Sequence, residues 1–151
     1  MDIENLLRLL KERKAKFVII GATAFPVHGY VRATVDVDLF IESSKHNAKN
    51  CLAALKAFGY DVSEITIDEL LKKKILIRQY LLEIDIHPFV KGIKFEDVWK
   101  NKVKAKLGRV DTYFASLDDL IKMKKAAGRP RDKEDLRVLL KLKKKRKKSH
   151  T

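Results

Sequence analysis

The stretch FVIIGATAFPVHGYVRATVDVDLF, residues 17–40, decides which fold the chain adopts. It begins with the apolar run Phe17 to Ile20, which predicts a buried strand that leads directly into Gly21. A glycine has no Cβ, so the backbone there can turn sharply and approach a ligand closely. We expect a short helix over residues 22–30 to follow. A strand, a glycine turn and a helix start would together present free backbone amides to a phosphate.

The end of this stretch, residues 35–40, alternates acidic and apolar side chains in the order VDVDLF. In a strand, Asp36 and Asp38 would project on one side, while Val35, Val37 and Leu39 would enter the core. Two neighbouring carboxylates repel each other, so we expect a cation between them. Mg2+, a hard ion that prefers oxygen ligands, is the simplest choice.

The remaining sequence alternates predicted helices and strands, which indicates an α+β fold. Helices are expected over 3–14, 45–58, 66–74, 95–103 and 116–127 and from 132 onward, with N-caps at Ser44, Thr66, Ser116 and Asp132. Residues 75–80 and 81–90 predict either two strands or one long bent strand, and 104–107 with 109–114 predict a hairpin.

A third acidic residue in the second of these segments, Asp85, shares one strand face with Glu83 and His87. Three aspartates at a sheet edge could hold two Mg2+ ions about 4 Å apart, an arrangement that activates a hydroxyl and neutralises a departing pyrophosphate. Glu83 is an alternative third ligand. Asp85 is preferred because the apolar Ile84 and Ile86 flank it directly.

Length and composition limit the other possibilities. The chain has 151 residues and 46% hydrophobic residues, which favours one globular domain. No apolar run is long enough to span a bilayer and the N-terminus lacks signal-peptide features, so we expect a cytoplasmic protein without a membrane partner. The single cysteine, Cys51, is expected to fill the core. Trp99 is expected to anchor the core, and His28 to be packed or hydrogen-bonded rather than catalytic.

Half of the formal charge of +14 comes from residues 141–148, KLKKKRKK, which contain seven cations. This run is interpreted equally well as a solvated helix end, which the helix dipole favours, or as an electrostatic arm for a polyanion such as RNA. We therefore divide the chain into a domain over 1–142 and a basic tail over 143–151.

The ordered residues Gly21-Ala22, Ala24, Gly29, Arg32, Thr34, Asp36 and Asp38 resemble the signature of the polymerase-beta-type nucleotidyltransferase superfamily. The small prokaryotic branch with AbiEii-like toxins and minimal nucleotidyltransferases is the most similar. The resemblance continues through Glu83-Ile84-Asp85, Leu120-Ile121, Lys124, Gly128-Arg129 and Asp132, up to about residue 140. One departure is Ala22, where the family usually has Gly or Ser and an alanine offers no hydroxyl.

The resemblance implies a small mixed sheet flanked by helices, with further helices at the C-terminus. It also implies that Asp36 and Asp38 ligate both Mg2+ ions and that Asp85 completes one site. Gly21 and Ala22 would hold the triphosphate through backbone amides, and Arg32 and Lys124 would neutralise phosphate charge. From the residues alone, Arg32 could equally pair with a nearby acid, and Lys124 could be one exposed lysine among many.

These observations predict a Mg2+-dependent nucleotidyltransferase that moves a nucleoside monophosphate from ATP or another nucleoside triphosphate to an acceptor hydroxyl. The acceptor would be an RNA such as tRNA, a protein or a small molecule, and a homodimer or a partner protein would help to bind it. The alternative is a non-catalytic module on the same fold, which binds nucleic acid or a toxin–antitoxin partner. Three clustered aspartates favour the enzyme, because a surface for polyanions gains nothing from them.

Overall fold

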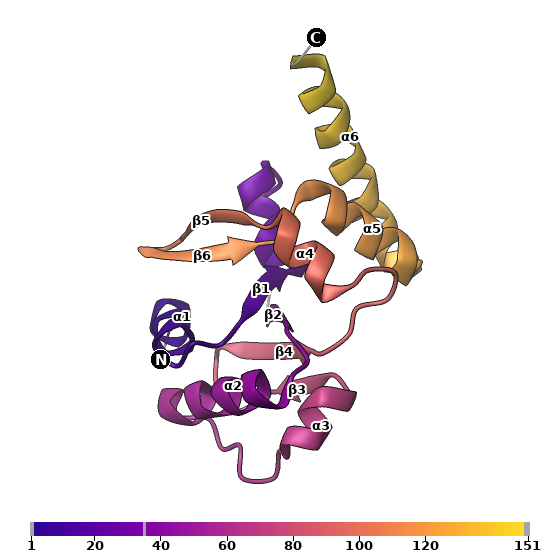
Figure 1. Cartoon of the computed structure of the whole chain (residues 1–151). Helices are drawn as coiled ribbons and strands as arrows, with labels where there is room; N and C mark the ends of the chain where they lie inside the picture. The colour runs from indigo at the N-terminus through magenta and orange to yellow at the C-terminus, as the bar shows by residue number, and fades with distance from the viewer. Residues whose placement is uncertain (1, 35, 150–151) are drawn as a thin grey trace.

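A six-stranded mixed sheet forms the centre of the computed structural model, which describes residues 2–34 and 36–149 (Figure 1). Its strand order is β3-β4-β2-β1-β6-β5. The strands are β1 (Phe17–Ile20), β2 (Asp36–Ile41), β3 (Ile75–Ile77), β4 (Glu83–His87), β5 (Val103–Leu107) and β6 (Val110–Phe114). β2 runs antiparallel to β1 and parallel to β4, and β6 runs parallel to β1. The sheet and its helices agree with the predicted α+β class.

The helices agree with the sequence predictions in order, with small shifts at their ends. They are α1 (Ile3–Glu12), α2 (Lys45–Phe58), α3 (Ile67–Lys72), α4 (Phe95–Asn101), α5 (Leu117–Ala127) and α6 (Lys133–Ser149), with two 3-10 helices, η1 (Gly21–His28) and η2 (Pro130–Asp132). The long segment that could have been one bent strand is two antiparallel strands, β3 and β4. Both predictions for the central stretch, a strand into Gly21 and a short helix after it, are confirmed.

Three of the four predicted N-caps are confirmed, because Ser44, Thr66 and Ser116 each accept a hydrogen bond from a first-turn amide. The fourth prediction, Asp132 as an N-cap, is wrong. Its carboxylate accepts hydrogen bonds from Lys124 and Arg129 instead, and a short 3-10 turn precedes α6. A carboxylate that meets two cations gains more from charge-assisted bonds than from one backbone amide.

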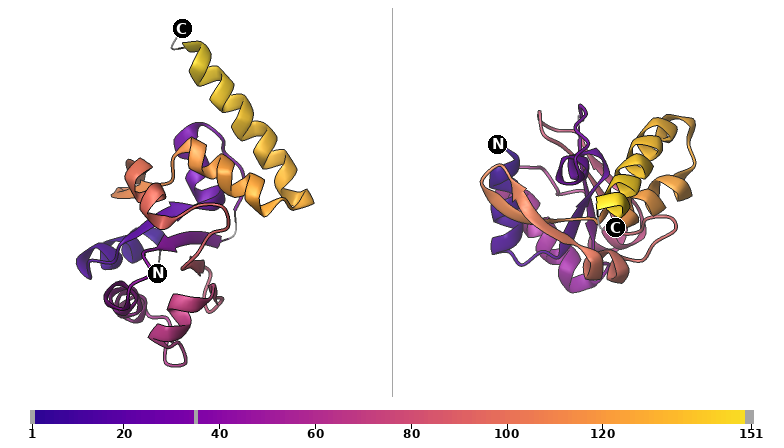
Figure 2. Two further views of the ribbon diagram at one scale, coloured as in Figure 1. Left: turned by 45° about the vertical axis from the view of Figure 1, so that its right-hand side comes forward. Right: turned by 90° about the horizontal axis from the view of Figure 1, so that it is seen from above.

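The two sides of the sheet differ in chemistry. Helices α2 and α3 lie on one side, and α5 and α6 lie on the other (Figure 1; Figure 2). Along β2 and β4, acidic side chains alternate with four buried apolar side chains, those of Val37, Leu39, Ile84 and Ile86. The prediction that Val37 and Leu39 enter the core is thus confirmed. Val35, which was predicted to face the core, lies outside the described residues. The acidic side chains consequently all project to the side of α5 and α6.

Helix α6 runs across positions 142 and 143 without interruption, so the described part of the predicted tail is helical. Its last turns extend away from the sheet (Figure 2). Lys143 pairs with Asp118 of α5 at 3.0 Å, and the Arg146 guanidinium donates to His28 Nδ1 at 2.9 Å. The lysine-rich end of α6 thus contacts the rest of the domain through Lys143 and Arg146. Among the described residues, no helix has both the length and the apolar character needed to cross a bilayer.

Candidate functional site

A cleft of about 800 Å3 opens between the ends of β1, β2 and β4 and the pair α5–α6. The residues predicted to form a site are distributed over a hundred positions of sequence, yet the fold brings all of them to this cleft. They are Gly21, Ala22, Arg32, Asp36, Asp38, Asp85 and Lys124. Other residues that line it include Lys74, His87, Lys91, Arg129 and Arg131.

The acidic side of the cleft follows from the register of two parallel strands. Asp36 is opposite Glu83, and Asp38 is opposite Asp85. Directly opposed residues project to the same face of a sheet, so these four carboxylates gather on one surface. We call Asp36, Asp38, Glu83 and Asp85 the acidic cluster. Asp85 is the most buried of its aspartates, with only 4% of its surface exposed.

Arg78, which follows β3, supplies positive charge to the acidic cluster. Its guanidinium lies 2.6 Å from Asp85 Oδ1, 3.3 Å from Glu83 Oε2 and 3.5 Å from Asp36 Oδ2. Lys74 Nζ lies 3.7 Å from Asp85 Oδ2. The sequence predicted a cation near the paired aspartates but did not identify this arginine. Nothing in its immediate sequence connects Arg78 to Asp36, because only the pairing of β3 with β4 brings them together.

The aspartates of the acidic cluster titrate differently. Burial raises the pKa of Asp36, and the nearby carboxylates of Asp85 and Asp38 raise it further. Burial also opposes the ionisation of Asp85, but contacts with Arg78 and Asp36 outweigh it and lower the pKa of Asp85. Of these two aspartates, Asp85 therefore holds its negative charge more firmly, and Asp36 takes up a proton more readily.

A second observation on this side concerns His87, the last residue of β4. Its Nε2 lies 2.8 Å from Asp38 Oδ1. Asp38, Asp85 and His87 each offer a ligand atom, and these atoms lie within 4.8 Å of one another. Two carboxylates and an imidazole are a donor set that fits a divalent cation. Asp36 is not part of this group among the described residues. The alternation of β4 predicted His87 on this strand face, but no sequence signal indicated a role for its imidazole.

Gly21 sits directly against the acidic cluster, at the end of β1. Its φ is +70°, and a Cβ built there would lie 2.5 Å from Asp38 Oδ2. A side chain would therefore displace the Asp38 carboxylate from its position. The hydroxyl of Thr34 donates to the Asp36 carbonyl at 3.0 Å, so Thr34 supports the start of β2. The structure leaves space beside Asp38 that only a glycine preserves.

The opposite side of the cleft carries positive charge in an ordered network. The Arg32 guanidinium donates to both Asp135 carboxylate oxygens at 2.8 Å, and the Tyr30 hydroxyl donates to Oδ1 at 2.9 Å. Lys124 Nζ lies 3.0 Å from Asp132 and 3.2 Å from Asp135. With Arg129, which pairs with Asp132 at 2.7 Å, these residues form what we call the basic network.

The basic network answers both questions that the sequence left open. Arg32 does pair with an acid, and it also lines the cleft. Lys124 is not an exposed surface lysine, because only 15% of its side chain is accessible. Burial opposes ionisation of Asp132, but the bonds from Arg129 and Lys124 lower its pKa to about 2. Both carboxylates of the network are thus fixed in the ionised form.

The remaining single residues agree with their predictions. Cys51 and His28 are buried, and His28 Nε2 donates to the Ala115 carbonyl at 2.8 Å. Trp99 is partly buried and packs against Phe95 of the core. His28 is not among the residues that line the cleft, which is consistent with a packing role.

The chain matches a known protein family. A family model described as "Nucleotidyltransferase of unknown function (DUF6036)" matches residues 1–142. That range contains every residue of the acidic cluster and the basic network. The description names neither a substrate nor the AbiEii-like branch. No curated protein matches the chain.

Proposed function

The chain belongs to this family of nucleotidyltransferases of unknown function, and we propose on that premise that it transfers a nucleoside monophosphate from a nucleoside triphosphate to an acceptor hydroxyl. One observation carries the proposal: the three aspartates of the acidic cluster and the basic network line the same cleft. A metal–triphosphate complex needs ligands for a cation on one side and cations for its phosphates on the other. The cleft provides both.

The acidic side fits a divalent ion by its donor set and by the space that Gly21 leaves beside Asp38. Asp38, Asp85 and His87 would hold one ion, and Asp36 with Asp38 would hold the second. A bound Mg2+ ion supplies charge for the departing pyrophosphate and lowers the pKa of the acceptor hydroxyl. Arg78 offsets part of the charge of the cluster in the present arrangement and would release Asp36 for the second ion.

The basic side would bind the phosphates. Arg32 is held rigidly by two bonds to Asp135, and a guanidinium in a fixed orientation loses little entropy when it binds a second anion. Lys124 lies between two carboxylates and would contribute mainly through its charge. Ala22 lacks a hydroxyl, so the turn at residues 21 and 22 would contact phosphate through backbone amides alone.

The acceptor that the surface favours is RNA. Lys141, Lys144, Lys145 and Lys147 are exposed along the projecting end of α6. A run of this charge binds phosphodiester backbones without sequence specificity, and the affinity falls as salt increases. Replacement of these four lysines by Gln should weaken RNA binding and reduce the salt slope. Equal binding with an unchanged slope would remove α6 from the proposal.

The direct test of the proposed reaction is incubation of the protein with labelled nucleoside triphosphates, Mg2+ and total RNA or cell lysate, followed by mass spectrometry of the products. Transfer of a monophosphate is expected, and the double variant Asp38→Asn/Asp85→Asn should lose it. Asp111→Asn, which removes an exposed aspartate outside the cleft, is the matched control and should retain it. Transfer that persists in the double variant would refute the assignment of the site.

Binding can be tested without the acceptor. A Mg2+–triphosphate complex that binds only the folded protein stabilises it by about 2.7 kcal/mol when the concentration of the free complex is a hundred times Kd. This stabilisation raises the melting temperature. The wild type and Asp111→Asn should show this rise, and the double variant should not. If no nucleoside triphosphate raises the melting temperature of the wild-type protein, the proposed nucleotide binding is contradicted.

A further inference from the structure

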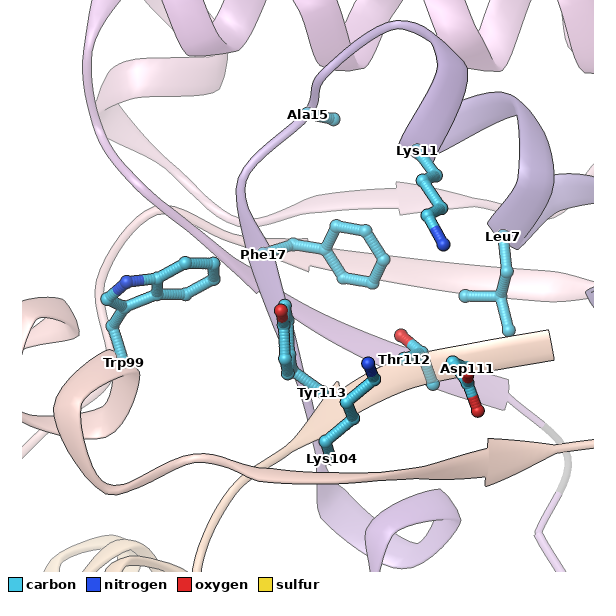
Figure 3. Close-up of a pocket in the computed structure, with 9 residues that line it drawn as sticks. All are labelled: Leu7, Lys11, Ala15, Phe17, Trp99, Lys104, Asp111, Thr112 and Tyr113. Carbon is cyan, nitrogen blue, oxygen red and sulfur yellow. The ribbon is translucent and has the colours of Figure 1, made fainter.

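A second hollow lies away from the cleft, between α1, the β5–β6 hairpin and Trp99 (Figure 3). Its volume is about 220 Å3, and none of its lining residues lines the cleft. Phe17 at the start of β1 borders this hollow, whereas Ile20 and Gly21 at the other end of β1 border the cleft. The hollow is therefore a separate site on the opposite end of the same strand. We call it the aromatic pocket.

The walls of the aromatic pocket are mainly apolar. Leu7 of α1, Phe17 and Tyr113 surround it, and the indole of Trp99 extends toward Phe17 from the far side (Figure 3). Trp99 and Tyr113 meet edge to face, with ring centroids 5.3 Å apart. Lys102 Nζ lies 4.0 Å from the centre of the Trp99 ring. An aromatic ring of a ligand in this pocket would thus pack against Phe17, Tyr113 and the end of the Trp99 indole.

Size restricts what the aromatic pocket can hold. An apolar cavity of about 150 Å3 accepts benzene, and pockets for larger ligands occupy about 300 to 1,000 Å3. At 220 Å3 the pocket fits one aromatic ring with a small substituent. A nucleotide is too large for it, whereas the cleft of about 800 Å3 has the necessary room.

Charge determines the nature of the substituent. The amines of Lys11 and Lys104 reach into the pocket from α1 and from β5 (Figure 3). Within residues 2–34 and 36–149, neither amine forms an ion pair or a hydrogen bond. The acid in the lining, Asp111, is already paired with Lys106 at 3.3 Å. Two cations without an acidic partner favour an anion.

One further polar group faces the same space. Thr112 is 7% exposed, and its side chain is part of the lining. Its hydroxyl has no hydrogen-bond partner among the described residues. Most polar groups that are largely buried form a hydrogen bond with protein or with water. Because the Thr112 hydroxyl has no such partner in the described part of the protein, it can form a hydrogen bond with a ligand oxygen. Few polar groups in an apolar wall are the usual composition of a small-molecule site.

We propose that the aromatic pocket binds a small aromatic carboxylate. The ring lies against Phe17 and Tyr113, and the carboxylate accepts hydrogen bonds from Lys11 and Lys104. A ring without the carboxylate leaves both amines without a partner, and a carboxylate without the ring leaves the apolar walls hydrated. Each part alone should therefore bind much more weakly than the two together. The proposal does not depend on the reaction proposed for the cleft.

The test uses a reporter that the chain already contains. Trp99 is the single tryptophan of the sequence and forms part of the pocket, so its fluorescence reports occupancy directly. Benzoate and phenylacetate are the probes, benzamide is the neutral ring and acetate is the anion without a ring. Both aromatic acids should change the Trp99 emission in a saturable way. Benzamide and acetate should bind at least about tenfold more weakly, which corresponds to about 1.4 kcal/mol.

Two double variants complete the test. Lys11→Ala/Lys104→Ala should weaken benzoate binding at least about tenfold, because the variant lacks both charged donors to the carboxylate. Lys141→Ala/Lys144→Ala removes the same charge from exposed α6 positions and should leave the affinity unchanged. Equal affinity in both double variants, equal affinity for benzamide, or no saturable change in emission would each overturn the proposal. Melting temperatures of the variants establish that they are folded.

Discussion

The two sides of the cleft use charge in opposite ways. The acidic cluster sets four carboxylates against two cations, Arg78 and Lys74, and so carries an excess of negative charge. The basic network sets Arg32, Lys124 and Arg129 against two carboxylates, Asp132 and Asp135. Charges that match at short distance stabilise a fold, whereas an unmatched excess favours an external ligand.

This difference predicts that the basic network contributes mainly to stability and that the acidic cluster contributes mainly to ligand binding. In the basic network every charged group has a partner within 3.2 Å, and the network connects residues before β2 to α5 and α6. Removal of one of its carboxylates should destabilise the protein. In the acidic cluster, the carboxylates repel one another, and removal of one should change ligand binding far more than stability.

The largest effect is expected for Asp135→Asn. Asp135 is buried and accepts bonds from Arg32, Tyr30 and Lys124. Its neutralisation leaves the partly exposed Arg32 guanidinium without an acidic partner and Lys124 with Asp132 alone. The free energy of unfolding should therefore fall by about 3 kcal/mol in urea titration. Glu134→Gln breaks an exposed pair with Arg137 and should cost about 0.5 kcal/mol or less. A loss in Asp135→Asn no larger than in that control would refute a structural role for the network.

The second prediction concerns Gly21→Ala, which alters the acidic cluster by volume rather than charge. An alanine at φ +70° is strained, and its Cβ would meet the Asp38 carboxylate. We expect a loss of about 2 kcal/mol and no rise in melting temperature with the metal–triphosphate complex. Gly29→Ala also places an alanine at positive φ, but its Cβ has ordinary contact with Leu142. That control should lose about 1 kcal/mol and should keep the ligand response.

The third prediction concerns the pH dependence of stability, which differs between the basic network and the acidic cluster. The pKa of Asp132 is lowered to about 2, so the folded state binds fewer protons than the unfolded state between pH 3.8 and about 2. The stability from this group is present above pH 3.8 and is lost as the pH falls through that window. We expect a loss of about 1 to 2 kcal/mol there in wild type.

Two variants check the assignment of this acid sensitivity. Asp132→Asn should reduce the slope of unfolding free energy against pH below pH 3.8. The pKa of Asp36 is raised, so this group has the opposite sign: its contribution is present at low pH and is lost as the pH rises. Asp36→Asn should therefore remove a gain in stability that the wild type shows as the pH falls toward 3.8, and should leave the loss below pH 3.8 in place. Identical slopes in both variants would contradict the contrast between the two sides.

Local sequence signals predicted most of the fold. Apolar alternation identified β2 and β4, and Ser44 and Ser116 marked two helix starts. These features depend on neighbouring residues, which is why a single sequence reveals them. The likeness to a nucleotidyltransferase signature was also sufficient to select seven residues that line one cleft.

Contacts between distant segments were harder to predict. Arg78 reaches Asp36 only because β3 pairs with β4 and β4 pairs with β2. Asp132 was assigned as an N-cap from its place before α6, but Lys124, one helix earlier, competes for its oxygens. Asp135 was not predicted at all, since an acid in the first turn of a helix is common and its partner Arg32 lies over a hundred residues away. Charge networks thus require the tertiary structure.

The smallest change in stability is expected for Asp85→Asn, and this result distinguishes most clearly between the two sides. Asp85 is as buried as Asp135, and burial alone would predict a similar cost for its neutralisation. However, Arg78 retains Glu83 and Asp36 as partners, and the repulsion among the carboxylates decreases. The free energy of unfolding should therefore change by less than about 1 kcal/mol, while the response to Mg2+ and nucleotide should disappear. A loss as large as that of Asp135→Asn would mean that the acidic cluster serves the fold in the same way as the basic network. A small loss with the ligand response intact would instead move the metal ligands to Asp36 and Asp38.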